Sequence, residues 1–154
     1  MGAWQRINAL HCRERTLFAF AAALRRGAAE LEAHRTPTGE LLELLAMDND
    51  PGVSRFFGQI YRDMDREGPA VFSSAWNRSV QGCTVLEPGE RQTLTALGQV
   101  LGQYGVGDTC AALKRCGDFF QQEGEQVRRQ IPEQTRVYLG VGLSWGAIAG
   151  ILLI

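Results

Sequence analysis

The sequence is poor in the residues from which most catalytic sites are built. Its 154 residues include two histidines, four cysteines and a single lysine, Lys114. A phosphate-binding loop needs clustered glycines followed by a lysine and a serine or threonine. Lys114 stands between Leu113 and Arg115 instead, so this motif is absent. Paired acids such as Glu30 and Glu32 fall on different faces of a helix and indicate a solvated surface.

Metal and redox chemistry find no support in the spacing of the remaining ligands. His11 and His34 lie about six turns apart in one expected helix, too far to share a metal ion. The cysteines lack the paired spacing of zinc or dithiol sites and indicate free thiols in a reducing cytoplasm; they are Cys12, Cys83, Cys110 and Cys116. We therefore expect no metal and no cofactor. We predict that the protein is not an enzyme. An enzyme is the less favoured alternative, because catalytic groups converge in space rather than in sequence.

Positive charge is also not in excess. The formal net charge is -1, which gives no reason to expect nucleic acid as a partner. Charge is missing altogether from one long stretch, Val137 to Ile154. At about 1.5 Å per residue this stretch spans roughly 27 Å as a helix, close to the hydrocarbon core of a bilayer. We predict a helical domain over residues 1–132 and a transmembrane helix within residues 133–154.

The expected membrane helix carries small residues on one face. Gly142, Gly146 and Gly150 recur every four residues, a spacing that lets another helix approach closely in lipid. The alternative is that glycine is simply common in membrane helices. Arg128, Arg129 and Arg136 precede the span and nothing charged follows it. The positive-inside rule therefore places the helical domain in the cytoplasm.

Turn-forming residues divide the rest of the chain into about six expected helices, and no segment reads as a convincing strand. Leucines recur every seven residues from Leu10 to Leu31 in a long first helix. This seam predicts packing on another helix of the same domain, with a partner chain as the alternative. Thr36 and Pro37, and then Asp50 and Pro51, have the residue types that begin helices. We predict an all-α antiparallel bundle with short connections, including turns at 48–52 and 105–108 and a loop over 82–89.

Several of these features together resemble the stage III sporulation protein AB family. Thr36-Pro37 opens a short leucine-rich helix after a long Arg- and Ala-rich one, and Ala75-Trp76 follows in the middle of the chain. Leu97-Gly98 and Leu101-Gly102, followed by Asp108, resemble the Leu-Gly-x-x-Leu-Gly…Asp signature of that family. The terminal helix has Gly142 and Gly146 where the family has its Gly-x-x-x-Gly. The resemblance covers roughly residues 13–154.

The resemblance implies a non-catalytic structural component of a sporulation channel or secretion-like complex in an endospore-forming bacterium. Its domain would resemble the cytoplasmic domain of the type II secretion inner-membrane platform. It would lie on the mother-cell side of the membrane, beside other membrane proteins of the complex and a cytoplasmic secretion-type ATPase. Trp76, Gly98, Gly102 and Asp108 are the positions expected to shape the domain or its interface. The alternative function is a tail-anchored helical adaptor unrelated to sporulation.

Two departures from the family pattern stand out. Family members usually carry another membrane helix before the long first helix, whereas this sequence starts at Met1-Gly2-Ala3-Trp4. Either the start is truncated or this member has one span. The family also tends to place a glutamine shortly after the aspartate, where this chain has Ala111 and Ala112, and residues 103–107 resemble a small insertion.

Overall fold

The computed structural model describes residues 3–103 and 106–131, and this part of the chain is built from helices without strands. Six α-helices and one short 3-10 helix follow one another along the chain. They are α1 (Ala3–His34), α2 (Thr38–Ala46), α3 (Pro51–Glu67), η1 (Pro69–Val71), α4 (Phe72–Gln81), α5 (Pro88–Gln103) and α6 (Val106–Gln130). The all-α prediction is therefore confirmed for the described residues.

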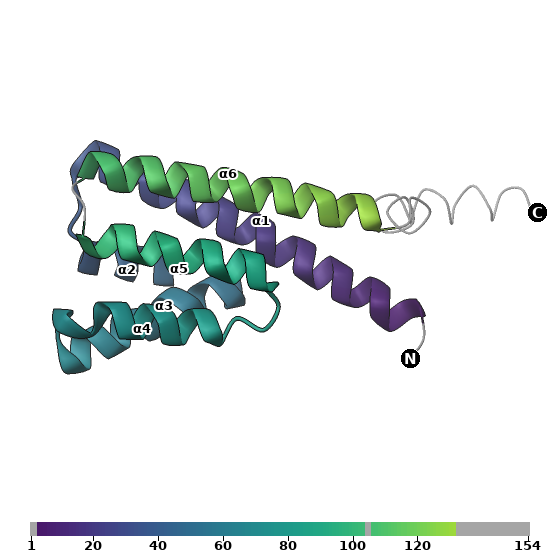
Figure 1. The fold of residues 1–154 in the computed structure, drawn as a ribbon, viewed down its shortest axis with the longest axis horizontal. Helices are drawn as coiled ribbons and strands as arrows, with labels where there is room; N and C mark the ends of the chain where they lie inside the picture. Colours follow the sequence, from purple (N-terminus) through teal and green to yellow (C-terminus); the bar gives the residue numbers. More distant parts are fainter. Residues whose placement is uncertain (1–2, 104–105, 132–154) are drawn as a thin grey trace, which may run out of the picture.

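The helices from α2 to α6 pack each on its sequence neighbour, and α1 packs along α6 (Figure 1). Contacts between α1 and α6 run in opposite chain directions: Glu14 meets Arg128, Arg25 meets Asp118, and Glu32 meets Lys114. The pair is thus antiparallel, as Figure 1 also shows, with the start of α1 and the end of α6 at the same end of the bundle.

The leucine seam of α1 packs inside its own chain. Leu17, Leu24 and Leu31 are at most 5% exposed, and the facing stripe of α6 includes Leu113 and Phe120, which are equally buried. The prediction of an intramolecular seam is confirmed, because apolar residues spaced every three or four positions on both helices interlock along the pair.

Aromatic rings join the α1–α6 pair to the other helices. The Phe20 ring stacks on Phe120 of α6, with centroids 5.7 Å apart, and meets Phe56 of α3 edge-on at 5.4 Å. Phe56 in turn meets Trp76 of α4 at 5.1 Å. This chain of contacts places four helices around one core, and edge-on aromatic pairs add to the stabilisation given by burial.

Helix starts follow the sequence signals in one case and depart from them in two. Asp50 caps α3 as predicted, since its carboxylate accepts the Val53 amide at 3.1 Å. Thr36 does not cap α2; its hydroxyl donates to Glu30, and Pro37 stands before the helix rather than in its first position. The turn predicted over 105–108 is also wrong in extent, because α6 already begins at Val106. Asp108 then lies in the first turn of α6, where its negative charge interacts favourably with the helix dipole.

No helix within the described residues has both the length and the apolar character needed to span a bilayer. The predicted transmembrane helix of residues 133–154, with its Gly142, Gly146 and Gly150 face, lies outside the described residues. The division into a helical domain and a membrane helix stays a prediction.

Candidate functional site

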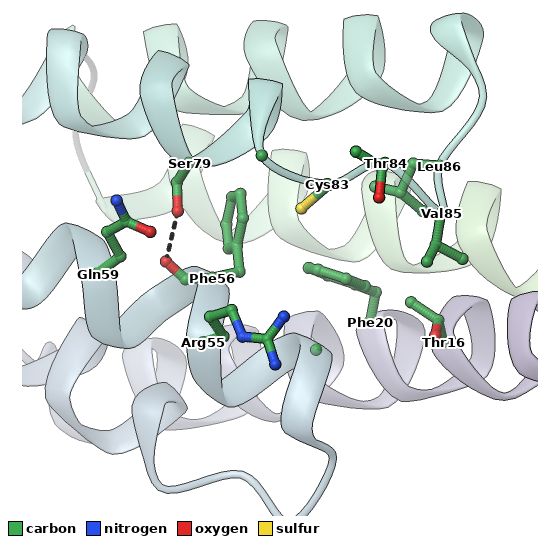
Figure 2. A pocket seen from close by; sticks show the side chains of 12 residues that line it. Thr16, Phe20, Arg55, Phe56, Gln59, Ser79, Cys83, Thr84, Val85 and Leu86 are labelled. Carbon is green, nitrogen blue, oxygen red and sulfur yellow. Dashed lines mark hydrogen bonds between the residues drawn. The ribbon is translucent and has the colours of Figure 1, made fainter.

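A small cleft lies between α1, α3 and the loop that joins α4 to α5 (Figure 2). Its volume is about 120 Å³. Helix α1 contributes Thr16 and Phe20, α3 contributes Gly52, Arg55, Phe56 and Gln59, and Ser79 ends the α4 side. The loop supplies the remaining wall from Gly82 to Leu86. The cleft is thus lined by three helices, α1, α3 and α4, and by the loop between α4 and α5.

Local hydrogen bonds hold the walls of the cleft in place. The Ser79 hydroxyl donates to the Phe56 carbonyl at 2.8 Å, which ties α4 to α3 beside the cleft (Figure 2). In the loop, the Cys83 amide donates to the Val80 carbonyl and the Leu86 amide to the Cys83 carbonyl. Leu86 is only 2% exposed and anchors the loop in the core. The cleft is therefore preformed rather than left open by a loose loop.

Cys83 is the one cysteine in this cleft, and its thiol is not set up for covalent chemistry. Burial raises the pKa of Cys83 to about 11, while the positive charges of Arg91 and Arg55 act in the opposite direction. The thiol is then neutral near neutral pH, and the thiolate is the form that attacks substrates. Ligand pockets of enzymes commonly measure about 300–1,000 Å³. The cleft, at about 120 Å³, is smaller than such pockets.

A group of interacting polar side chains lies where α1, α5 and α6 meet. The Arg13 guanidinium forms a bidentate pair with the Glu90 carboxylate, at 2.6 and 2.5 Å, and also donates to the Val85 carbonyl. Glu90 is 1% exposed, and it accepts the Glu87 amide at 3.0 Å, which caps the start of α5. Glu123 of α6 lies near Glu90, and the two carboxyl groups can share a hydrogen bond when Glu123 is protonated. We call Arg13, Glu90 and Glu123 the buried polar cluster after its centre, Glu90, since Arg13 and Glu123 are themselves half-buried.

The pKa of Glu123 lies above its ordinary value of 4.5. Desolvation is the largest cause, followed by the hydrogen bond to Glu90 and the negative charge of that residue. A carboxyl group whose pKa rises on folding stabilises the fold at a pH below its unfolded value, and this stabilisation is lost as the pH rises through the folded value.

Glu123→Gln should therefore stabilise the bundle near neutral pH, by less than about 1 kcal/mol, and have little effect near pH ~4. Glutamine keeps a hydrogen bond to Glu90 without the charge. Denaturant unfolding at both pH values measures the difference, and the exposed Glu43→Gln serves as the control. A stabilisation of the same size at both pH values would show that relief of charge is not its cause.

Of the positions predicted to shape the domain, Trp76 and Gly98 are in direct contact. Trp76 is 1% exposed, and its indole N–H donates to the Leu94 carbonyl of α5 at 2.6 Å. A Cβ atom at Gly98, one turn further along α5, would lie 2.3 Å from the Trp76 ring. The Trp76 side chain thus packs directly on the Gly98 backbone, and this contact joins α4 to α5 in the core.

Gly102 and Asp108 lie apart from that contact. A Cβ at Gly102 would meet the Phe72 ring at an ordinary 3.5 Å, and Gly102 is exposed. Asp108 is exposed in the first turn of α6. The four predicted positions therefore do not form one site.

Within residues 3–103 and 106–131, no group of three histidine, cysteine or acidic side chains comes together to hold a metal ion. All four cysteines are free thiols, and Cys110 and Cys116 are buried in the core. His11 and His34 are both on α1, and the His11 imidazole lies 3.8 Å from Glu14.

Sequence reasoning did not find the cleft or the buried polar cluster. The cleft gathers residues from positions 16 to 86, and no short motif marks such a gathering. The cluster had one local signal in the sequence. Glu90 follows Glu87 by three residues at the start of the helix that begins with Pro88, and this is the spacing of a helix-capping box. That signal predicts the start of α5 but not the pairing with Arg13, 77 positions away.

Comparison with known proteins gives one match. A family model described as stage III sporulation protein AB matches residues 1–154, the whole sequence. No curated protein and no solved structure matches the chain.

Proposed function

The chain belongs to the stage III sporulation protein AB family, and from this premise we propose that it is a non-catalytic structural component of a membrane-bound sporulation channel or secretion-like complex. The observation that carries the proposal is the extent of the family match, which covers all 154 residues and is not confined to one motif. In this role the helical domain binds other proteins, and the chain has no reaction of its own to perform.

The geometry of the bundle supports a docking role on a membrane. The start of α1 and the end of α6 share one end of the molecule (Figure 1). A membrane helix within residues 133–154 would hold this end toward the bilayer. Helices α2 to α5 and the cleft beside α3 would then be free to meet a cytoplasmic partner. The arginines before the apolar stretch favour the cytoplasmic side, which in a sporulating cell is that of the mother cell.

We propose two kinds of partner. Other membrane proteins of the complex would pack against the tail through Gly142, Gly146 and Gly150, since small residues allow close approach in lipid. A cytoplasmic secretion-type ATPase would bind the helical domain. Nucleic acid is not among the proposed partners.

Deleting the gene in an endospore-forming host tests the role itself. We expect loss of heat-resistant spores, normal vegetative growth, and restoration of spores by the wild-type chain. A fluorescent fusion should gather at the membrane around the forespore. Normal spore counts, with the protein spread over the membranes of vegetative cells, would favour the alternative of a tail-anchored adaptor unrelated to sporulation.

Gly146→Leu tests the proposed role of the tail. Leucine is apolar, so insertion into the membrane should be unchanged, but its side chain would keep a neighbouring helix from approaching. We expect the variant to fractionate with membranes as the wild type does and to recover less of the membrane partners after detergent solubilisation. Leu143→Ile, a change of shape in the same stretch, is the control. Unchanged recovery with Gly146→Leu would make the tail a simple anchor.

A further inference from the structure

The cleft beside α3 has the shape and charge of a docking site (Figure 2). We propose that a partner protein inserts one apolar side chain into this cleft, beside the Phe20 ring, and places a neighbouring carboxylate against Arg55. This inference rests on the proposed docking function and gives that function a surface and a partner chemistry.

Apolar side chains form the floor of the cleft. Phe20, Phe56 and Leu86 all line it and are at most 2% exposed. A cavity of about 150 Å³ lined by apolar groups holds a benzene molecule. The volume here, about 120 Å³, is somewhat smaller and therefore suits a leucine or methionine side chain. Val85 stands on the rim and is 41% exposed, so it extends the apolar surface outward.

The positive charge beside the cleft is not neutralised by an ion pair with any of the described residues. Arg55 lines the cleft and is exposed, and neither it nor Arg91 takes part in an ion pair there. The charges of both arginines also act against the burial that raises the pKa of the Cys83 thiol. Figure 2 shows the Arg55 guanidinium, the Cys83 sulfur and the Phe20 ring around the same space.

Among the residues that the structure describes, no acidic residue lines the cleft, and the acids next to its lining residues in the sequence already have partners. Asp50 accepts the Val53 amide at the start of α3. Glu87 and Glu90 lie against Arg13, with Glu90 in the bidentate pair. A partner carboxylate is thus the group that would neutralise Arg55. Arginine beside a desolvated apolar pocket is a common arrangement at the centre of protein interfaces.

Photo-cross-linking of the full chain in sporulating cells tests the docking site. Benzoylphenylalanine replaces Thr84, an exposed residue on the wall of the cleft. We expect a protein adduct whose cross-linked peptide, identified by mass spectrometry, carries an apolar residue next to an aspartate or glutamate. Adding Arg55→Glu should lower the adduct yield about tenfold or more, because a salt bridge becomes a like-charge contact.

Arg115→Glu is the matched control, since Arg115 is an exposed arginine of α6 away from the cleft and makes the same change of charge. Its adduct yield should equal that of the wild type. Exchanging the partner acid for arginine should restore the adduct with Arg55→Glu. Thermal unfolding of both variants checks that neither loses its fold.

Three results would overturn the docking site: no protein adduct at Thr84, an adduct that Arg55→Glu leaves unchanged, or adducts to lipid alone. The proposed function fails separately. A charge-dependent adduct to a protein outside the sporulation complex keeps the docking site and removes that function. Recovery of the ATPase without an adduct at Thr84 keeps the function and removes the docking site.

Discussion

Gly98→Ala should lower the free energy of unfolding by about 3 kcal/mol, although alanine is the better helix former by about 1 kcal/mol. The new Cβ would lie 2.3 Å from Trp76 Cδ1 and 2.5 Å from its indole nitrogen. The indole has little room to move, because it is 1% exposed, donates to the Leu94 carbonyl and packs against the rings of Phe56 and Phe72. Either α4 and α5 separate or the hydrogen bond breaks.

Gly102→Ala, on the same helix one turn later, is the matched control. Its Cβ would make only an ordinary contact with Phe72, so the gain in helix propensity should leave it as stable as the wild type or stabilise it by up to about 1 kcal/mol. Thermal unfolding of the full chain in detergent, followed by far-ultraviolet circular dichroism, compares the two. Equal effects of the two substitutions would mean that the contact between Trp76 and Gly98 is not tight.

Arg13→Met should lower the free energy of unfolding by about 3–5 kcal/mol. Methionine keeps much of the apolar stem of arginine but removes the guanidinium that pairs with Glu90. The Glu90 carboxylate, 1% exposed, is then left in the core beside Glu123 without a cation. Arg13→Met also removes the hydrogen bond that holds the Val85 carbonyl of the loop. The variant should therefore loosen the wall of the cleft as well as the bundle.

Two further variants separate the buried charge from general packing. Arg25→Met breaks a pair with Asp118 in which both side chains are about half exposed, so it should change stability by less than about 1 kcal/mol. Glu90→Gln retains the cap of the Glu87 amide without its charge, and adding it to Arg13→Met should recover part of the loss. A double variant no better than Arg13→Met would place the loss in packing and not in charge.

Periodicity was the strongest guide to the fold. The leucines of α1 predict a seam, and the structure buries Leu17, Leu24 and Leu31 in the core that α1 shares with α6, with Leu10 partly buried. Turn chemistry correctly gave the start of α3, because Asp50 and Pro51 have the residue types that cap and begin a helix. It failed at Thr36, whose hydroxyl reaches Glu30 in a contact that depends on how α1 ends. Arg35 has a positive φ of 49° at that point, and its residue type does not predict such a turn.

The functional surface was much harder to predict. Trp76 and Gly98 belong to a recognisable pattern, but only the packing of α4 on α5 reveals that they touch. The contact between Arg13 and Glu90 spans 77 positions, and a lone arginine in a helix gives no sign of a buried partner. Arg55 looked like any surface cation in the sequence. Its interest arises from the fold, where it lines the cleft and takes part in no ion pair with the described residues.

Affinity isolation of the full chain from membranes of sporulating cells, with quantification of what accompanies it, tests the central claim most directly. If the helical domain docks a cytoplasmic component of the sporulation complex, the preparation should contain a secretion-type ATPase together with membrane proteins of that complex. The same isolation from vegetative cells expressing the chain should lack them. A preparation from sporulating cells in which the chain is intact but neither the ATPase nor the membrane proteins are enriched would contradict the claim.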